Sequence, residues 1–132
     1  MLIIRIIAGQ AELITGSSDP REIARFFQAR GVKTVVVKLG SRGCYCAGED
    51  TAFFCGCYHV PVVETTGAGD AFVSGFLTGV GQGKTLEECV QLGTAVSAFA
   101  VQAAGATAGV PDYDTVVNFM NSEKGPEITY DF

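Results

Sequence analysis

Basic residues are few in this chain and are not clustered. Lysine and arginine contribute 9 of the 132 residues against 14 acidic ones, which leaves a net charge of −5 at pH 7. A nucleic-acid groove needs clustered Lys and Arg to displace counterions, so the composition excludes nucleic acid as a partner. Histidine occurs once, at His59, and no matched partner residue identifies it as a catalytic base, so we expect it at the surface.

Long apolar runs are also missing. The apolar segment at residues 1–7 is followed directly by Ala8-Gly9-Gln10, so it is too short for the core of a signal peptide or for a membrane span. The sequence therefore predicts neither a secretory signal nor a membrane partner. Five cysteines in a chain without such a signal indicate free thiols in a reducing compartment, and we expect a cytoplasmic protein.

The remaining composition is that of a globular chain. Apolar residues make up 48% of the sequence and charged residues 17%, which is typical of a folded domain rather than of a disordered segment. A chain of this length forms one domain with a sizeable core. We expect that domain at residues 1–121, with residues 122–132 as a C-terminal tail of linker-like composition.

The order of the expected elements indicates an α/β layer sandwich. β-Branched and apolar runs predict strands at residues 1–7 and 33–39, a hairpin at 44–47 and 52–58, and an extended segment at 60–63. Apolar periodicity and capping residues predict helices at residues 10–14, 20–30, 70–80, 86–104 and 112–121.

The most informative segment is 64–72, which reads Glu-Thr-Thr-Gly-Ala-Gly-Asp-Ala-Phe. Gly67, Ala68 and Gly69 leave backbone N–H groups uncovered at a helix start, where the dipole also favours an anion. Asp70 beside that anion is suited to take a proton from an alcohol during phosphoryl transfer. These four residues are the predicted catalytic set; the alternative from spacing alone is a tight loop before a buried helix.

This segment resembles the second signature of the PfkB, or ribokinase-like, carbohydrate kinases, Asp-Thr-x-Gly-Ala-Gly-Asp-x-Phe, at every position but the first. The resemblance implies ATP-dependent transfer of a phosphoryl group to a sugar hydroxyl, with Asp70 as general base and Mg²⁺ on the phosphates. It also implies part of a three-layer α/β/α sandwich. The resemblance covers only the C-terminal, nucleotide-binding half, so we expect a fold without the N-terminal half and the β lid.

Two earlier segments resemble the same family in the expected order. Residues 38–43 resemble the strand and turn that lies along the nucleotide, and residues 11–16 resemble the family's Asn-x-x-Glu segment, with Gly9 in place of the asparagine. Without the family, the first is an ordinary turn and Glu12 a solvated carboxylate. For the nucleotide, the resemblance implies contacts from Lys38, Gly40, Ser41, Gly43, Thr94 and Gly105. For metals, it implies Glu12 at Mg²⁺ and Glu64 with Thr66 at K⁺, whose activating role stays open because Glu64 replaces an aspartate.

A second phosphate loop is suggested by residues 78–85, because Gly83-Lys84-Thr85 ends as a Walker A motif does. Position 78 is threonine rather than glycine, and the segment follows a helix rather than a strand. We therefore predict a helix-to-helix turn in which Thr85 caps the next helix.

Four of the cysteines flank the expected hairpin turn as two Cys-x-Cys pairs. A turn centred on residues 48–50 places Cys44 opposite Cys57 and Cys46 opposite Cys55 on one face. A zinc site is conceivable, but neighbouring strand positions give poor tetrahedral geometry, so free thiols are the preferred interpretation.

Three functional hypotheses remain open. The favoured one is an ATP-dependent sugar kinase that is incomplete and inactive as this chain alone, with ATP and a small sugar as substrates. The second is a nucleotide-binding module that completes another chain or self-associates, since half a sheet exposes a strand edge. The third is a non-functional remnant. The identity of the sugar cannot be derived from these residues.

Overall fold

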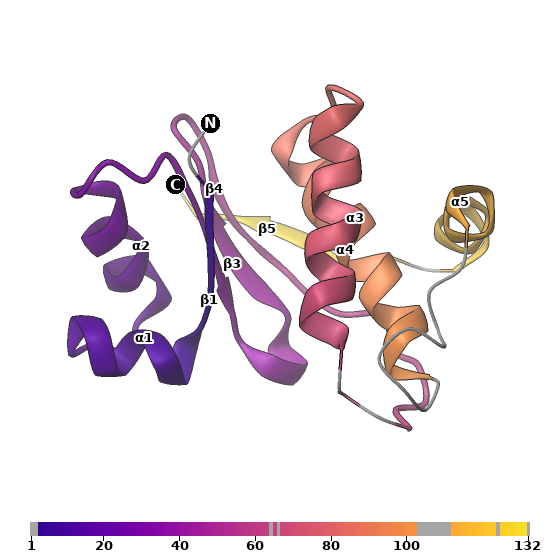
Figure 1. Ribbon diagram of the computed structural model, residues 1–132, viewed down its shortest axis with the longest axis horizontal. Helices are drawn as coiled ribbons and strands as arrows, with labels where there is room; N and C mark the ends of the chain where they lie inside the picture. The colour runs from indigo at the N-terminus through magenta and orange to yellow at the C-terminus, as the bar shows by residue number, and fades with distance from the viewer. Residues whose placement is uncertain (1–2, 64, 66, 103–111, 124, 132) are drawn as a thin grey trace. The chain divides into compact units, whose positions relative to one another are not determined.

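The structure is a computed structural model that describes residues 3–63, 65, 67–102, 112–123 and 125–131 (Figure 1). The chain divides into two compact units. Unit 1 contains residues 1–56 and 127–132, and unit 2 contains residues 57–126.

Unit 1 is built on a five-stranded sheet with the order β1-β2-β3-β4-β5. The strands are β1 (Ile3–Ile7), β2 (Thr34–Lys38), β3 (Cys44–Ala47), β4 (Ala52–Cys55) and β5 (Ile128–Tyr130). β1 and β2 are parallel, and the other neighbours are antiparallel. The predicted strands and hairpin are thus confirmed, and residues 60–63, predicted as an extended segment, belong to no helix or strand.

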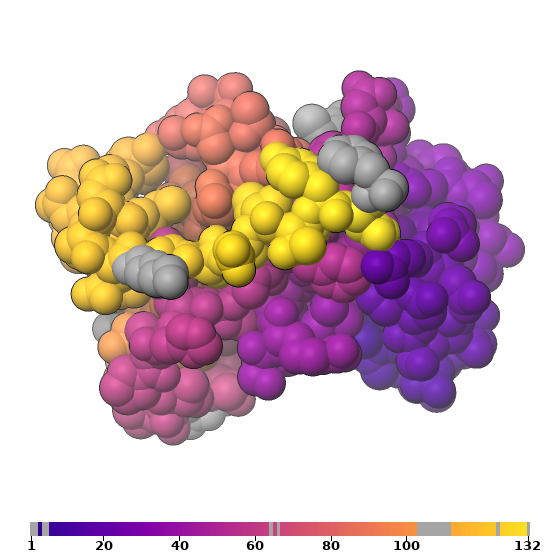
Figure 2. Space-filling view, turned by 180° about the vertical axis from the view of Figure 1, so that it is seen from behind, coloured from indigo at the N-terminus to yellow at the C-terminus, as the bar shows by residue number. Residues whose placement is uncertain are grey.

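The strand β5 lies in the segment that the composition assigns to a tail. It pairs with β4, with Ile128 opposite Cys55 and Tyr130 opposite Phe53. Figure 2 shows this yellow C-terminal segment at the surface, where Thr129 and Tyr130 are exposed. Three residues are too few to show strand periodicity, so only the pairing with β4 reveals this strand.

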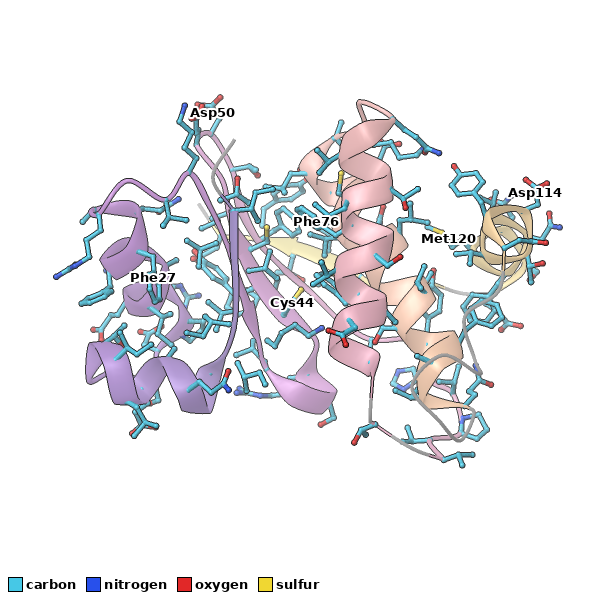
Figure 3. The ribbon with its side chains drawn as sticks, in the orientation of Figure 1. Phe27, Cys44, Asp50, Phe76, Asp114 and Met120 are labelled. Atoms are coloured by element: carbon cyan, nitrogen blue, oxygen red, sulfur yellow. The ribbon has the colours of Figure 1, made fainter. Side chains whose placement is uncertain are left out.

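Two helices of unit 1 pack on one face of the sheet. They are α1 (Ala8–Thr15) and α2 (Pro20–Gln28), and α2 starts with Asp19, whose side chain accepts a hydrogen bond from the backbone N–H of Arg21. Ala11 of α1 and Ile23 of α2 are fully buried against strand residues, and Phe27 packs against the same cluster (Figure 3). Because Pro20 occupies the first helical turn, α2 begins where the sequence predicts.

The hairpin β3–β4 has a different register from the predicted one. Cys44 lies opposite Cys55, and Ala47 lies opposite Ala52. The N–H of Gly48 donates to the carbonyl of Thr51 (2.8 Å), whereas the predicted cysteine pairs would place Gly48 opposite Phe53, two residues further along the chain. The predicted facing pairs of cysteines are therefore wrong, although Cys44, Cys46 and Cys55 still share one face and are buried.

Unit 2 is helical among its described residues. It contains α3 (Ala68–Gly81), α4 (Leu86–Val101) and α5 (Tyr113–Ser122), in agreement with the three predicted helices. Val116 of α5 is buried in a cluster with α4 residues, and Met120 packs against the same cluster (Figure 3). No helix within the described ranges is long and apolar enough to cross a membrane.

Candidate active site

The N-terminus of α3 carries the predicted catalytic set. Gly67 precedes the helix with φ +84° and ψ −6°, a left-handed conformation that glycine adopts without strain. Ala68 and Gly69 are half-buried, and Asp70 is exposed in the first helical turn. The short residues keep side chains away from this turn, so its backbone donors and one carboxylate are the groups that a ligand would meet.

The turn before α3 is held by two backbone hydrogen bonds. The N–H of Ala68 donates to the carbonyl of Thr65 (3.2 Å), and the N–H of Ala71 donates to the carbonyl of Gly67 (2.9 Å). The first bond occupies the N–H of Ala68, and the second is the first helical hydrogen bond of α3. The start of α3, where the sequence predicts an anion site, is therefore held by backbone hydrogen bonds and not by a side-chain cap.

Thr94 lies in the middle of α4 and is 8% exposed. Its hydroxyl donates to the carbonyl of Val90 in the same helix (2.8 Å). This bond uses the hydroxyl proton within the helix, so in this conformation the Thr94 oxygen could meet a nucleotide only as a hydrogen-bond acceptor.

The predicted nucleotide strand and turn belong to unit 1. Lys38 is the half-buried last residue of β2, and Gly40 and Ser41 are exposed in the short 3₁₀ helix η1 (Gly40–Arg42). Gly43 follows with φ +93°, and a Cβ built on it would lie 1.9 Å from the carbonyl oxygen of Cys55. Gly43 is therefore required for the hairpin itself, independently of any nucleotide.

Glu12 is exposed on α1, as is Gly9 three residues earlier. Residues three apart in a helix are neighbours on its surface. A Cβ at Gly9 would meet no atom within 4 Å, so a larger residue has room there. The asparagine of the family motif would therefore fit at residue 9 without a packing conflict.

Three predicted site residues, Glu64, Thr66 and Gly105, lie outside the described residues. The Walker-like segment forms the turn between α3 and α4, as predicted. Thr85 caps α4, and Thr85 and Glu88 form a reciprocal capping box. None of the five cysteines forms a disulfide, and no group of three metal-ligating side chains occurs in the described part of the chain.

Sequence reasoning missed a polar cluster in unit 1. The Nε of Arg21 donates to Asp131 (2.7 Å), and the hydroxyl of Tyr45 donates to the same carboxylate (3.1 Å). Burial, followed by the Asp131 carboxylate, raises the pKa of Tyr45 to about 12, and Arg21 lowers the pKa of Asp131. The cluster lines a cavity of about 340 Å³ and ties the C-terminal segment to α2. No local signal marks Asp131, because its partners are distant in sequence.

Comparison with known proteins agrees with the sequence resemblance. The model of the pfkB family of carbohydrate kinases matches residues 6–113. A 2-dehydro-3-deoxygluconokinase from Bacillus subtilis is 35% identical over 116 residues, which cover 87% of this chain and 36% of the relative.

Solved structures agree in fold. Ribokinase from Thermotoga maritima superposes with a TM-score of 0.83 and 28% identity, over 91% of this chain and 42% of that one. Arabidopsis thaliana ribokinase in complex with ribose and ATP has a TM-score of 0.80 and 30% identity, over 89% of this chain and 40% of that one. These similarities define a partial α/β ribokinase-like fold, as predicted.

The chain belongs to the pfkB family of carbohydrate kinases. It spans about 40% of the length of the relatives named above.

Proposed function

We propose that this chain is the nucleotide-binding and catalytic portion of an ATP-dependent sugar kinase. The observation that carries the proposal is the start of α3, where Gly67 opens the turn and Asp70 is the exposed carboxylate of the first helical turn. The family match over residues 6–113 supports the same reaction class. Because the chain spans about 40% of its relatives, we propose that it needs further protein to phosphorylate a sugar.

The reaction that we propose is direct transfer to an alcohol. The carboxylate of Asp70 accepts the proton of a sugar hydroxyl as the oxygen attacks the γ-phosphoryl group of ATP. Backbone N–H groups of Gly67, Gly69 and Asp70 stabilise the charge on the transferred group without a lysine, whereas that of Ala68 already donates to the carbonyl of Thr65. No covalent enzyme intermediate is required.

The remaining assignments follow from the family resemblance. We propose that the nucleotide is contacted by Lys38, Gly40, Ser41, Gly43, Thr94 and Gly105. Glu12 would hold Mg²⁺ through water, and one exposed carboxylate suits this ion, which usually keeps several waters and binds substrate phosphates. That ion would neutralise phosphate charge. K⁺ near Glu64 and Thr66 is a further proposal, as is a cytoplasmic location.

A second candidate function is that of a module completed by another polypeptide or by a second copy. Among the described residues, β1 has a neighbour only at β2, so one of its edges is unpaired within this part of the chain. Three large apolar side chains of unit 1 are exposed on β1 and α1: Ile7 (48%), Leu13 (89%) and Ile14 (58%). An unpaired strand edge favours pairing with another strand, and exposed apolar side chains favour association with another chain.

Calorimetric titration of the chain with ATP and Mg²⁺ tests the proposed function. We expect wild-type chain and Asp70→Ala to bind, because the backbone donors remain, whereas Gly69→Glu should lose binding because it places a carboxylate at the anion site. Circular dichroism confirms that each variant is folded. A folded wild-type chain that does not bind ATP would contradict the proposal and favour an inherited motif without activity.

A further inference from the structure

The helices α3 and α4 of unit 2 approach each other through glycines. A Cβ built on Gly93 of α4 would lie 2.7 Å from the carbonyl oxygen of Phe72 and 3.1 Å from two atoms of its ring. A Cβ built on Gly75 would lie 2.8 Å from the Cα of Gly93. Two glycines therefore face each other at this crossing, and neither helix has room for a methyl group there.

This contact lies close to the proposed phosphate-binding turn. Phe72 follows Asp70 by two residues on α3, a rise of about 3 Å along the helix. The carbonyl of Phe72 belongs to the rigid backbone, so it cannot move aside as a flexible side chain would. Any shift that Gly93 imposes on Phe72 is therefore passed to Asp70 and to the donors before it.

The size of that shift is set by the contact distance. A Cβ at residue 93 would lie 2.7 Å from the carbonyl oxygen of Phe72. That distance is about 0.7 Å less than the 3.4 Å at which ordinary contact begins. Catalytic and binding groups need to be held within about 0.5 Å of their productive positions. A methyl group on α4 is thus large enough to disturb the turn at residues 67–70 through its contact with Phe72.

We infer that Gly93 is a positioning residue, which sets the first turns of α3 and through them the backbone donors and carboxylate of residues 67–70. This inference rests on the proposed function for its consequence in ATP binding. The position of the turn itself can be measured without ATP.

The matched control is Gly79 at the other end of the same helix pair. A Cβ there would lie 2.9 Å from the Sγ and 3.0 Å from the Cα of Cys89, so it also overpacks the α3–α4 contact. Gly79 follows Asp70 by nine residues, about 14 Å along the helix. Gly93→Ala and Gly79→Ala should both lower stability, but only the first should alter the proposed site.

The first measurement is the ¹H–¹⁵N spectrum of each variant. We expect Gly93→Ala to shift the amide signals of residues 67–70 and Gly79→Ala to leave them in place. In the second measurement, calorimetry with ATP and Mg²⁺, Gly93→Ala should weaken binding about tenfold or more, and Gly79→Ala by less than about twofold. If Gly93→Ala does not fold, Gly75→Ala replaces it, since its Cβ presses on the same crossing.

Each outcome decides a separate point. Unchanged amide signals at residues 67–70 in a folded Gly93→Ala chain would overturn the inference, and so would equal losses of ATP affinity in the two variants. Shifted signals in Gly93→Ala, together with a wild-type chain that binds no ATP, would support the positioning role and overturn the proposed function.

Discussion

Replacing Gly43 by alanine should lower the stability of unit 1 far more than replacing Gly40 by alanine. Both glycines have positive φ, +93° at Gly43 and +64° at Gly40, so alanine is strained at each by at least about 1–2 kcal/mol, and more so at Gly43, whose ψ of −126° lies outside the left-handed helical region. The two sites also differ in the space for a methyl group. A Cβ at Gly40 meets nothing within 4 Å, whereas at Gly43 it meets the Cys55 carbonyl oxygen at 1.9 Å.

The collision at Gly43 must be relieved by moving the backbone. The N–H of Leu39 donates to the carbonyl of Gly43 (2.8 Å), and Cys44 next to it pairs with Cys55 of β4. Moving Gly43 away from Cys55 disturbs both interactions in a buried part of the sheet. Adding overpacking of about 1–3 kcal/mol and a hydrogen bond of about 1 kcal/mol to the strain gives a loss of about 3–6 kcal/mol.

Urea unfolding of unit 1, followed by circular dichroism and by hydrogen exchange of the sheet amides, measures the difference. We expect Gly40→Ala to lower the free energy of unfolding by about 1–2 kcal/mol. Gly43→Ala should lower it by at least about 2 kcal/mol more, or prevent folding. Equal losses for the two variants would refute the assignment of Gly43 to a close approach between the turn and β4.

Two further predictions concern the polar cluster and α1. Because the folded-state pKa of Tyr45 is raised to about 12 from 10, the contribution of this phenol to stability should be constant below pH 10 and be lost between pH 10 and 12; urea unfolding at pH 8 and pH 11 should show a smaller fall in Tyr45→Phe than in the wild-type chain, and an equal fall would argue against the cluster. Gly9→Asn restores the asparagine of the family motif where there is room for it, so calorimetry should show tighter binding of ATP with Mg²⁺ and no change without Mg²⁺; Gly9→Ala is the control, and equal affinities for both variants would count against a role for this helix at the metal.

Local sequence signals predicted most elements because each signal acts within a few residues. Asp19 and Pro20 place the start of α2, and Thr85 with Glu88 places the start of α4. The motif around Asp70 was likewise correctly expected at a helix start. Capping and turn conformations depend on neighbouring backbone groups, so the sequence carries them directly.

Features that depend on distant partners were not predicted. The register of β3 with β4 differs by two residues from the expected one, because the hydrogen bond between Gly48 and Thr51 closes a shorter turn. The strand β5 is too short to have a pattern of its own. The bond from Arg21 to Asp131 spans 110 residues, and neither residue is informative alone.

By itself, the sequence determined the α/β class and the family, and it predicted the residues of the candidate site, since these follow from composition and from motifs with local geometry. Only the tertiary structure decided that Gly43 and Gly93 are sites of close backbone contact, and that the C-terminal segment adds a strand to the sheet. The physical reason is that van der Waals contact and strand pairing join groups far apart in the chain, so they depend on the packed fold and not on any one segment.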